Sequence, residues 1–242
     1  MKNTIKPYKN SSLSKKEQVA KMFDNISRNY DFLNHFLSLG IDIYWRKKLV
    51  KHLKKQSPAN ILDVATGTSD LAIAMLKAKP QEIIGIDISK GMLEIGNKKL
   101  KKKSLNHKIK LQLADSEKLP FKNDTFEAVT VSFGARNFEN LEKGLSEMYR
   151  VLKPKGKLYI LEFSQPEIFP FKQVYHFYFK YILPLIGKIF SRDNAAYNYL
   201  PESVGAFPYG IKLNKIIEKS GYNKAKNYSL TMGIASIYIA EK

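Results

Sequence analysis

Acidic residues stand at the ends of three short apolar runs in the sequence. Asp63 follows ANIL, Asp87 closes EIIGID, and Asp115 comes directly after IKLQLA. An ionised carboxylate accepts hydrogen bonds from hydroxyl, amino and ammonium groups, and it repels phosphate. If the three runs are strands of one sheet, these carboxylates gather at one edge and suit an uncharged or cationic ligand.

The turn after the first acid, ATGTSD, contains a single glycine, Gly67. A dinucleotide-binding loop needs three small residues, so that its backbone can approach a pyrophosphate and its helix can pack on the strand. Here those places hold Ala65, Gly67 and Asp70, and the aspartate adds bulk and negative charge. No lysine-serine or lysine-threonine pair follows, which argues against a phosphate-binding P-loop. The loop favours a cationic sulfonium group with an amino acid tail.

Asp87 lies about twenty residues after Gly67, where ribose-binding acids lie, since a carboxylate can accept both ribose hydroxyl protons. The alternative is that Asp87 only caps a helix that starts at Ser89. After the third run, Asp115 can accept a hydrogen bond from an adenine amino group, and Ser116 can meet a ring nitrogen. The sequence thus predicts a nucleoside site that holds no phosphate.

The elements that position these residues alternate between strand and helix, which predicts an α/β fold with a Rossmann-like, doubly wound, mostly parallel sheet. Two final runs, separated only by Thr231 and Met232, predict an antiparallel C-terminal hairpin and a total of seven strands. We predict strands at 60–64, 82–87, 109–114, 128–132, 157–163, 223–230 and 233–240, with helices near 70–78, 89–103, 140–152 and 208–220.

Outside this pattern, we expect a flexible N-terminus over 1–14, followed by a single domain over 15–242. Residues 15–57 form its helical preface, because apolar side chains recur there near the helical period. Residues 166–205 form an aromatic insertion on the substrate side.

Composition narrows the chemistry. The chain has 242 residues, a formal charge of +19 and no cysteine, which excludes disulfides, thiolate metal sites and a cysteine nucleophile. The charge could attract nucleic acid or anionic lipid, although lysines spread along the whole chain also fit an ordinary solvated surface. No signal-peptide or membrane-spanning run is present, so a cytoplasmic location is expected.

The three strand-end acids together resemble the class I S-adenosylmethionine-dependent methyltransferases. Two segments, YDFLNHFLSLGIDIYW at 30–45 and RVLKPKGKLYILEFS at 150–164, resemble the signatures of the UbiE/MenG quinone-biosynthesis C-methyltransferases. Three residues depart from that pattern: Asp42 stands where the family usually has histidine, and Lys155 and Ser69 replace glycines. The last two are expected to be tolerated provided that both avoid positive φ.

The resemblance implies methyl transfer from S-adenosylmethionine, a co-substrate, to a ring carbon of prenylated demethylmenaquinol, with no metal. A ubiquinone-pathway benzoquinol is the alternative acceptor. The same resemblance implies cofactor contacts at Thr68, Asp87, Asp115, Ser116 and Ser132, and the residues of the loop itself add Asp63 and Gly67 as cofactor-binding residues.

The reaction requires a group that stabilises the acceptor oxyanion or moves its proton. The candidates are Arg136 and Asn137, beyond the fourth strand, and Tyr30 and Tyr199, in the flanking segments. Arg136 suits charge stabilisation more than proton abstraction, because a guanidinium stays charged in proteins. Tyr30 could instead be a core aromatic of the preface. The four histidines lack ligand spacing, and His176 is the only one considered as a base.

The aromatic run at 168–190 has three interpretations: a lid over a prenyl-quinol pocket, an interfacial helix whose lysines meet anionic lipid, or plain packing on the sheet. Peripheral contact with the inner face of the membrane is expected, no nucleic acid partner is expected, and a homo-oligomer is possible. Two rival functions stay open, an RNA or DNA methyltransferase and a non-catalytic scaffold that binds S-adenosylmethionine. The sequence SFGARN after the fourth strand argues against the first, and the three intact acids argue against the second.

Overall fold

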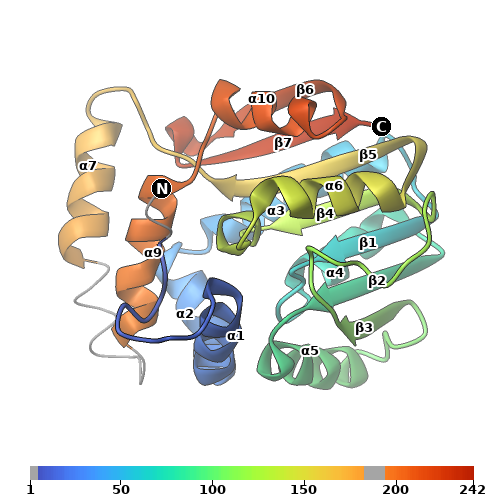
Figure 1. The fold of residues 1–242 in the computed structure, drawn as a ribbon, viewed down its shortest axis with the longest axis horizontal. Coiled ribbons are helices and arrows are strands. Elements are labelled where there is room, and N and C mark those ends of the chain that lie inside the picture. The colour runs from blue at the N-terminus through green and yellow to red at the C-terminus, as the bar shows by residue number, and fades with distance from the viewer. Residues whose placement is uncertain (1–4, 183–193) are drawn as a thin grey trace.

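A seven-stranded sheet forms the centre of the computed structural model, which describes residues 5–182 and 194–242 (Figure 1). The strand order is β3-β2-β1-β4-β5-β7-β6. The first five strands are parallel to one another, and β7 pairs antiparallel with both of its neighbours, β5 and β6. The predicted fold class is confirmed. The strands are β1 (Asn60–Val64), β2 (Glu82–Asp87), β3 (Ile109–Leu113), β4 (Phe126–Ser132), β5 (Leu152–Phe163), β6 (Asn223–Leu230) and β7 (Ala235–Glu241).

Strand order reverses between β1 and β4, because the chain moves outward from β1 through β2 to β3 and then returns to the other side of β1. Ligands of doubly wound sheets bind beyond the carboxyl ends of the strands at such a point. The predicted loop at 65–70 follows β1 and the predicted SFGARN segment spans the end of β4, so the topology brings them together.

Helices cover both faces of the sheet and bury two apolar cores. Leu49 and Leu53 of α3 (Ile41–Lys54) pack with α4 (Asp70–Met75) and α5 (Lys90–Lys102) on one face. On the other face, Leu145 of α6 (Leu141–Val151) and Leu213 of α10 (Ile211–Lys219) pack against β4, β5 and β7. The inner strands β1 and β4 are buried on both sides, as a covered parallel sheet requires, whereas the edge strands β3 and β6 are partly exposed.

The predicted helical preface consists of three helices. The first, α1 (Lys15–Ile26), begins with a capping box between Ser14 and Glu17, and a 3₁₀ turn then leads to α2 (Tyr30–Leu37). Gly40, at φ 74°, ends this pair and starts α3 in a new direction. Val19, Met22 and Leu33 form a separate apolar cluster with α9 (Asn194–Ala206). Figure 1 shows α1, α2 and α9 on the side toward which the arrows of β1, β4 and β5 point.

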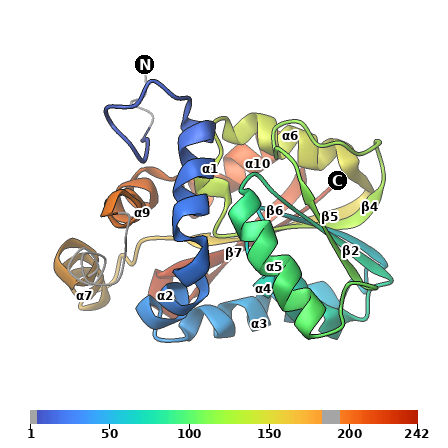
Figure 2. The ribbon, with the colours of Figure 1, turned by 90° about the horizontal axis from the view of Figure 1, so that it is seen from below.

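The aromatic insertion leaves the sheet after β5. It forms α7 (Phe171–Phe177) and a π-helical turn (Tyr178–Ile182), and the predicted part at 183–190 lies outside the described residues. Figures 1 and 2 both place α7 beyond α9, at the periphery of the molecule. No helix within 5–182 or 194–242 is both long and apolar enough to cross a membrane.

Two expectations about turns are wrong. Ser69 has φ 72° and Lys155 has φ 65°, so both adopt the left-handed conformation that glycine would take more easily. The C-terminal hairpin is confirmed, but its connection is longer than two residues. Thr231–Gly233 form a 3₁₀ turn in which all three residues have positive φ, so the chain curls and β7 starts only at Ala235.

Candidate active site

A cleft lies beyond the carboxyl ends of β1, β2 and β4, where ligands of doubly wound sheets bind. We call it the strand-end cleft. The structure brings five of the predicted cofactor residues to its wall: Gly67, Asp87, Asp115, Ser116 and Ser132.

Asp87 organises the turn on which this cleft is built. Its carboxylate accepts hydrogen bonds from the backbone N–H of Gly67 at 2.8 Å and of Ser89 at 2.9 Å. Burial raises the pKa of Asp87, and these hydrogen bonds oppose the rise. The cap of α5 is Ser89 itself, whose hydroxyl accepts from the Met92 N–H, so capping does not account for Asp87.

One oxygen of the Asp115 carboxylate is paired with a lysine from the helical preface. The ammonium of Lys16 on α1 lies 2.5 Å from one carboxylate oxygen of Asp115, and the Glu117 N–H donates to the other. This contact raises the pKa of Lys16. An adenine amino group that binds Asp115 must therefore share or displace Lys16, a residue that the strand pattern could not point to.

A smaller cavity continues from the strand-end cleft toward β1, and we call it the side pocket. Tyr30, Ala65, Gly67 and Ser132 line both cavities. The side pocket is lined further by Arg46, Asp63, Thr66, Thr68, Asp70 and Leu71.

Asp63, at the floor of the side pocket, is buried with both oxygens engaged. It accepts hydrogen bonds from Thr130 at 2.5 Å and Thr66 at 2.7 Å. Burial raises the pKa of Asp63 to about 6, against the effect of these two hydrogen bonds. Asp63 therefore shapes the loop as well as lining the pocket.

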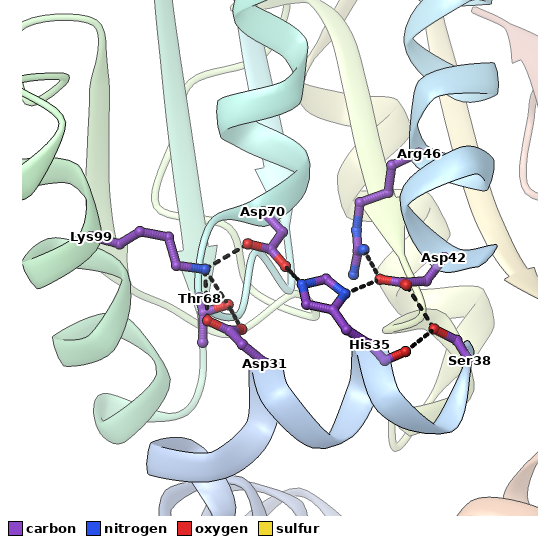
Figure 3. Close-up of polar contacts among 8 residues, drawn as sticks. All are labelled: Asp31, His35, Ser38, Asp42, Arg46, Thr68, Asp70 and Lys99. Carbon is purple, nitrogen blue, oxygen red and sulfur yellow. Dashed lines mark hydrogen bonds and ion pairs between the residues drawn. The ribbon is translucent and has the colours of Figure 1, made fainter. Parts of the chain in front are cut away.

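Thr68 and Asp70 belong to a polar network that joins α2 to the loop and to α5 (Figure 3). The Thr68 hydroxyl donates to Asp31 at 2.5 Å, and Lys99 forms ion pairs with Asp31 at 2.8 Å and Asp70 at 2.5 Å. His35 lies 3.4 Å from the other oxygen of Asp70. The sequence analysis interpreted the Asp70 charge as available to a cationic ligand, but in the structure Lys99 balances this charge within the protein.

A third cavity, the apolar pocket, lies between α1, α2 and α9. Its wall is mostly hydrophobic, yet it includes all four predicted catalytic residues, Tyr30, Arg136, Asn137 and Tyr199. Tyr30, Phe133 and Asn137 also line the strand-end cleft, so the two cavities share a wall. Tyr30 packs edge-on against Phe23 at that wall, which places it at the site and not in a separate core.

Several polar atoms of these walls have no hydrogen-bond partner among the residues that the structure describes. They are Nε of Arg136, Oδ1 of Asn137, the Tyr199 hydroxyl and Oγ of Ser132, and all are buried. A buried polar group without a partner costs roughly 1–3 kcal/mol, so such a cluster points to a ligand that supplies the missing partners.

Arg136 is held by an acid that the sequence interpretation missed. Its guanidinium donates to Glu162 at 2.7 Å and to the Phe133 carbonyl, and Glu162 is fully buried near the end of β5. The rule that strand ends carry site residues, applied to β5 as it was to β1 through β4, would have found Glu162. Arg46 of α3 was missed because it precedes the sheet altogether.

Tyrosines of the site stay protonated near neutral pH. Burial raises the pKa of Tyr199 to about 12 despite the opposing charge of Arg136, and burial also raises the pKa of Tyr30. Each can donate a hydrogen bond and neither serves as a resting base. His176 is exposed on α7 and does not line the apolar pocket. In the described part of the chain, no three metal-ligating side chains cluster.

Comparison with known proteins defines the class. A solved SAM-dependent methyltransferase from Thermotoga maritima, described as a possible histamine N-methyltransferase, superposes with a TM-score of 0.60 at 15% identity, covering 92% of this chain and 99% of that one. At this identity the likeness shows the fold alone, which is that of the S-adenosylmethionine-dependent methyltransferases.

The family follows from closer relatives. The model of the ubiE/COQ5 methyltransferase family matches residues 11–242, and the chain belongs to this family. It is 49% identical over 239 residues to the demethylmenaquinone methyltransferase of Bacteroides fragilis, covering 98% of this chain and 97% of that protein. It is 45% identical over 230 residues to the ubiquinone/menaquinone biosynthesis C-methyltransferase UbiE of Geotalea daltonii, covering 94% and 97%. The protein is therefore a methyltransferase, and S-adenosylmethionine is its methyl donor.

Proposed function

We propose that the protein methylates a ring carbon of a prenylated demethylmenaquinol and so forms menaquinol. The observation that carries this proposal is the apolar pocket, whose inner wall presents Arg136, Asn137 and Tyr199 with unpartnered polar atoms. A hydroquinone ring supplies two hydroxyl groups for these atoms, and its prenyl tail suits the apolar remainder. The printed names of the Bacteroides fragilis and Geotalea daltonii relatives support the same acceptor class.

For the cofactor, the fit of the strand-end cleft suggests a simple placement. Asp87 accepts the ribose hydroxyls, Asp115 and Ser116 meet the adenine, and Gly67 leaves room for close approach, since a Cβ there would meet nothing within 4 Å. The methionine tail then extends into the side pocket, toward Asp63, Thr68 and Ser132.

The proposed reaction depends more on stabilising the negative charge of the quinol phenolate than on a side chain that acts as a base. Ionisation of one quinol hydroxyl places negative charge on the adjacent ring carbon, which attacks the sulfonium methyl; the carbon–sulfur bond breaks, and the ring hydrogen leaves as a proton. Arg136 and Tyr199 both favour the phenolate, one by charge and one by hydrogen bonding. Among the described residues that line the apolar pocket, none is a carboxylate or an imidazole.

Peripheral contact with the inner face of an anionic membrane completes the proposal, because a prenyl quinol dissolves in the bilayer. Exposed apolar side chains occur on α7, on the segment before it and at the start of α3, including Leu39 at 82% and Phe169 at 76% exposure. The hydroxyl of Tyr178 donates to the Leu37 carbonyl at 2.7 Å, which holds these segments side by side. Lys47 and Lys172 lie exposed among them and suit anionic headgroups.

The test is methyl transfer by the purified protein from S-adenosylmethionine to a short-chain demethylmenaquinol, under reducing conditions. Tyr199→Phe removes one donor to the phenolate and should lower kcat roughly 10- to 100-fold while cofactor affinity stays unchanged. Tyr228→Phe on β6 is the matched control and should keep full activity. Asp87→Ala should abolish cofactor binding itself.

A benzoquinol assayed in parallel decides between the two acceptors. Cofactor binding without methylation of either quinol would contradict the proposal and favour the scaffold. Methyl transfer to RNA, with salt-sensitive RNA binding, would replace it with the first rival.

A further inference from the structure

The side pocket contains one cationic side chain among the described residues that line it, Arg46 of α3. Of its two acidic lining residues, Asp70 is already paired with Lys99, and Asp63, whose partners are neutral hydroxyls, suits the ammonium of a methionine tail. That tail also carries a carboxylate, which needs a cation or several hydrogen-bond donors. Among the described residues that line the side pocket, Arg46 is therefore the one whose charge suits the carboxylate.

Arg46 is held rigidly in place. The residue is only 8% exposed, and its guanidinium lies 5.8 Å from the centre of the Phe133 ring. One terminal nitrogen donates to Asp42, and Asp42 accepts further hydrogen bonds from Ser38 at 2.6 Å and from His35 at 2.8 Å (Figure 3). A guanidinium fixed on one side presents its remaining donors in a defined direction.

Asp42 carries the charge that this arrangement requires. Burial opposes its ionisation, but the Ser38 hydrogen bond and the Arg46 charge together hold the pKa of Asp42 below its usual value. The Asp42 that departs from the family pattern therefore has a defined role in this chain, as the shared acceptor between His35 and Arg46.

The rest of the guanidinium is available to a ligand. Asp42 is the single hydrogen-bond partner of Arg46 in the part of the chain that the structure describes. Arg46 also acts on the pocket electrostatically, since its charge opposes the rise that burial causes in the pKa of Asp63 and of Tyr30. Both of those residues line the side pocket.

We propose that Arg46 binds the carboxylate of the methionine tail of S-adenosylmethionine, and that Asp42 and His35 position its guanidinium. This inference rests on the cofactor placement given above and not on the identity of the methyl acceptor. Arg46 is accordingly a binding residue, and Asp42 and His35 are positioning residues.

The test compares two ligands that differ in the carboxylate alone, S-adenosylmethionine and decarboxylated S-adenosylmethionine, by calorimetric titration without any quinol. The double variant Asp42→Asn, Arg46→Met keeps the buried pair neutral and should bind S-adenosylmethionine roughly 10- to 100-fold more weakly, as expected for lost charge-assisted hydrogen bonds. Its affinity for the decarboxylated ligand should stay within about twofold. Lys47→Met, an exposed neighbour on α3, should leave both affinities unchanged.

Asp42→Asn alone should weaken S-adenosylmethionine binding less than the double variant, again without an effect on the decarboxylated ligand. An equal loss for both ligands would show a merely structural role and overturn the inference, as would unchanged binding of S-adenosylmethionine. A wild-type protein that binds neither ligand would contradict the cofactor placement itself. Failure of quinol methylation alone would leave the Arg46 result standing.

Discussion

Aspartates of the site differ in how their charge is balanced, and the difference decides what each can do. Asp42 stays ionised because it has cationic and hydroxyl partners. Asp70 is compensated by Lys99. Asp63 and Asp87 accept hydrogen bonds from neutral groups only, and burial raises the pKa of both. The last two are therefore the acids that gain most from a cationic or hydroxyl-bearing ligand.

Asp63 predicts a pH dependence of opposite sign for binding and for stability. Its pKa of about 6 in the fold exceeds the unfolded value of about 3.9, so the folded state takes up a proton as pH falls from about 6 to about 4. Stability contributed by this group therefore rises over that window. The ligand ammonium prefers the ionised form, so S-adenosylmethionine affinity should fall by up to about tenfold per pH unit below pH 6.

Calorimetric titration between pH 5 and 8 measures that slope. Asp63→Asn should bind more weakly at pH 8 and show a flatter pH profile, whereas Glu94→Gln, at an exposed carboxylate on α5, should retain the wild-type profile. An Asp63→Asn profile as steep as that of the wild type would assign the slope to another group.

At the scale of elements, the turn from β1 to α4 shows why a loop with one glycine works. Ala65, Gly67 and Ser69 all have positive φ, at 53°, 56° and 72°. Close packing is made possible by glycines of neighbouring elements: a Cβ on Gly96 would lie 2.7 Å from Ser69 Oγ, and one on Gly134 would lie 2.5 Å from Ala65 Cβ. The small residues that allow close packing therefore lie mostly in the neighbouring elements, at Gly96 and Gly134, and not within the loop.

Ser69→Gly should stabilise the protein by about 1 kcal/mol, because a left-handed non-glycine residue costs roughly 1–2 kcal/mol and the Ser69 hydroxyl is buried without a partner. The larger backbone entropy of glycine in the unfolded chain offsets part of this gain. Urea denaturation measures the free energy of unfolding. Ser104→Gly, at an exposed residue with φ 53°, isolates the backbone contribution. A lower midpoint for Ser69→Gly would show that the hydroxyl supports the turn.

The sequence predicted where the strands lie along the chain and that acids stand at their ends. Both were predictable because hydrophobic periodicity and the residues that follow each strand are local features of the sequence. The breaks in the preface and the curl at Thr231–Gly233 were not, since they depend on φ values imposed by packing. Contacts such as Lys16 with Asp115 and Arg136 with Glu162 join elements far apart in the chain. Only the fold reveals them.

For the whole molecule, the proposed membrane contact would give the large positive charge a role. Exposed apolar side chains occur on α2, α3 and α7 and exposed lysines on α3 and α7, whereas α10 packs on the face of the sheet opposite to α3. Lipid binding of this kind needs both insertion and charge attraction.

Leu39→Ser combined with Phe169→Ser should weaken binding to vesicles that contain anionic lipid by roughly tenfold, because each side chain loses a kilocalorie or more of apolar burial. Vesicle cosedimentation measures this, and added salt should weaken binding of the wild type as well. Ile211→Ser removes an equally exposed side chain from α10 and should have no effect. Equal losses for both variants would show nonspecific adsorption.

The wall shared by the strand-end cleft and the apolar pocket bears on the order in which the methyl donor and the quinol are expected to bind. Phe133 and Asn137 face both cavities, so in the proposed placement a cofactor bound in the strand-end cleft forms part of the surface that the quinol meets. A quinol that enters first finds that surface incomplete, whereas one that enters second finds the reactive methyl already in place. From the proposed placement of cofactor and quinol we therefore expect an ordered mechanism, with the donor bound first and its demethylated product released last.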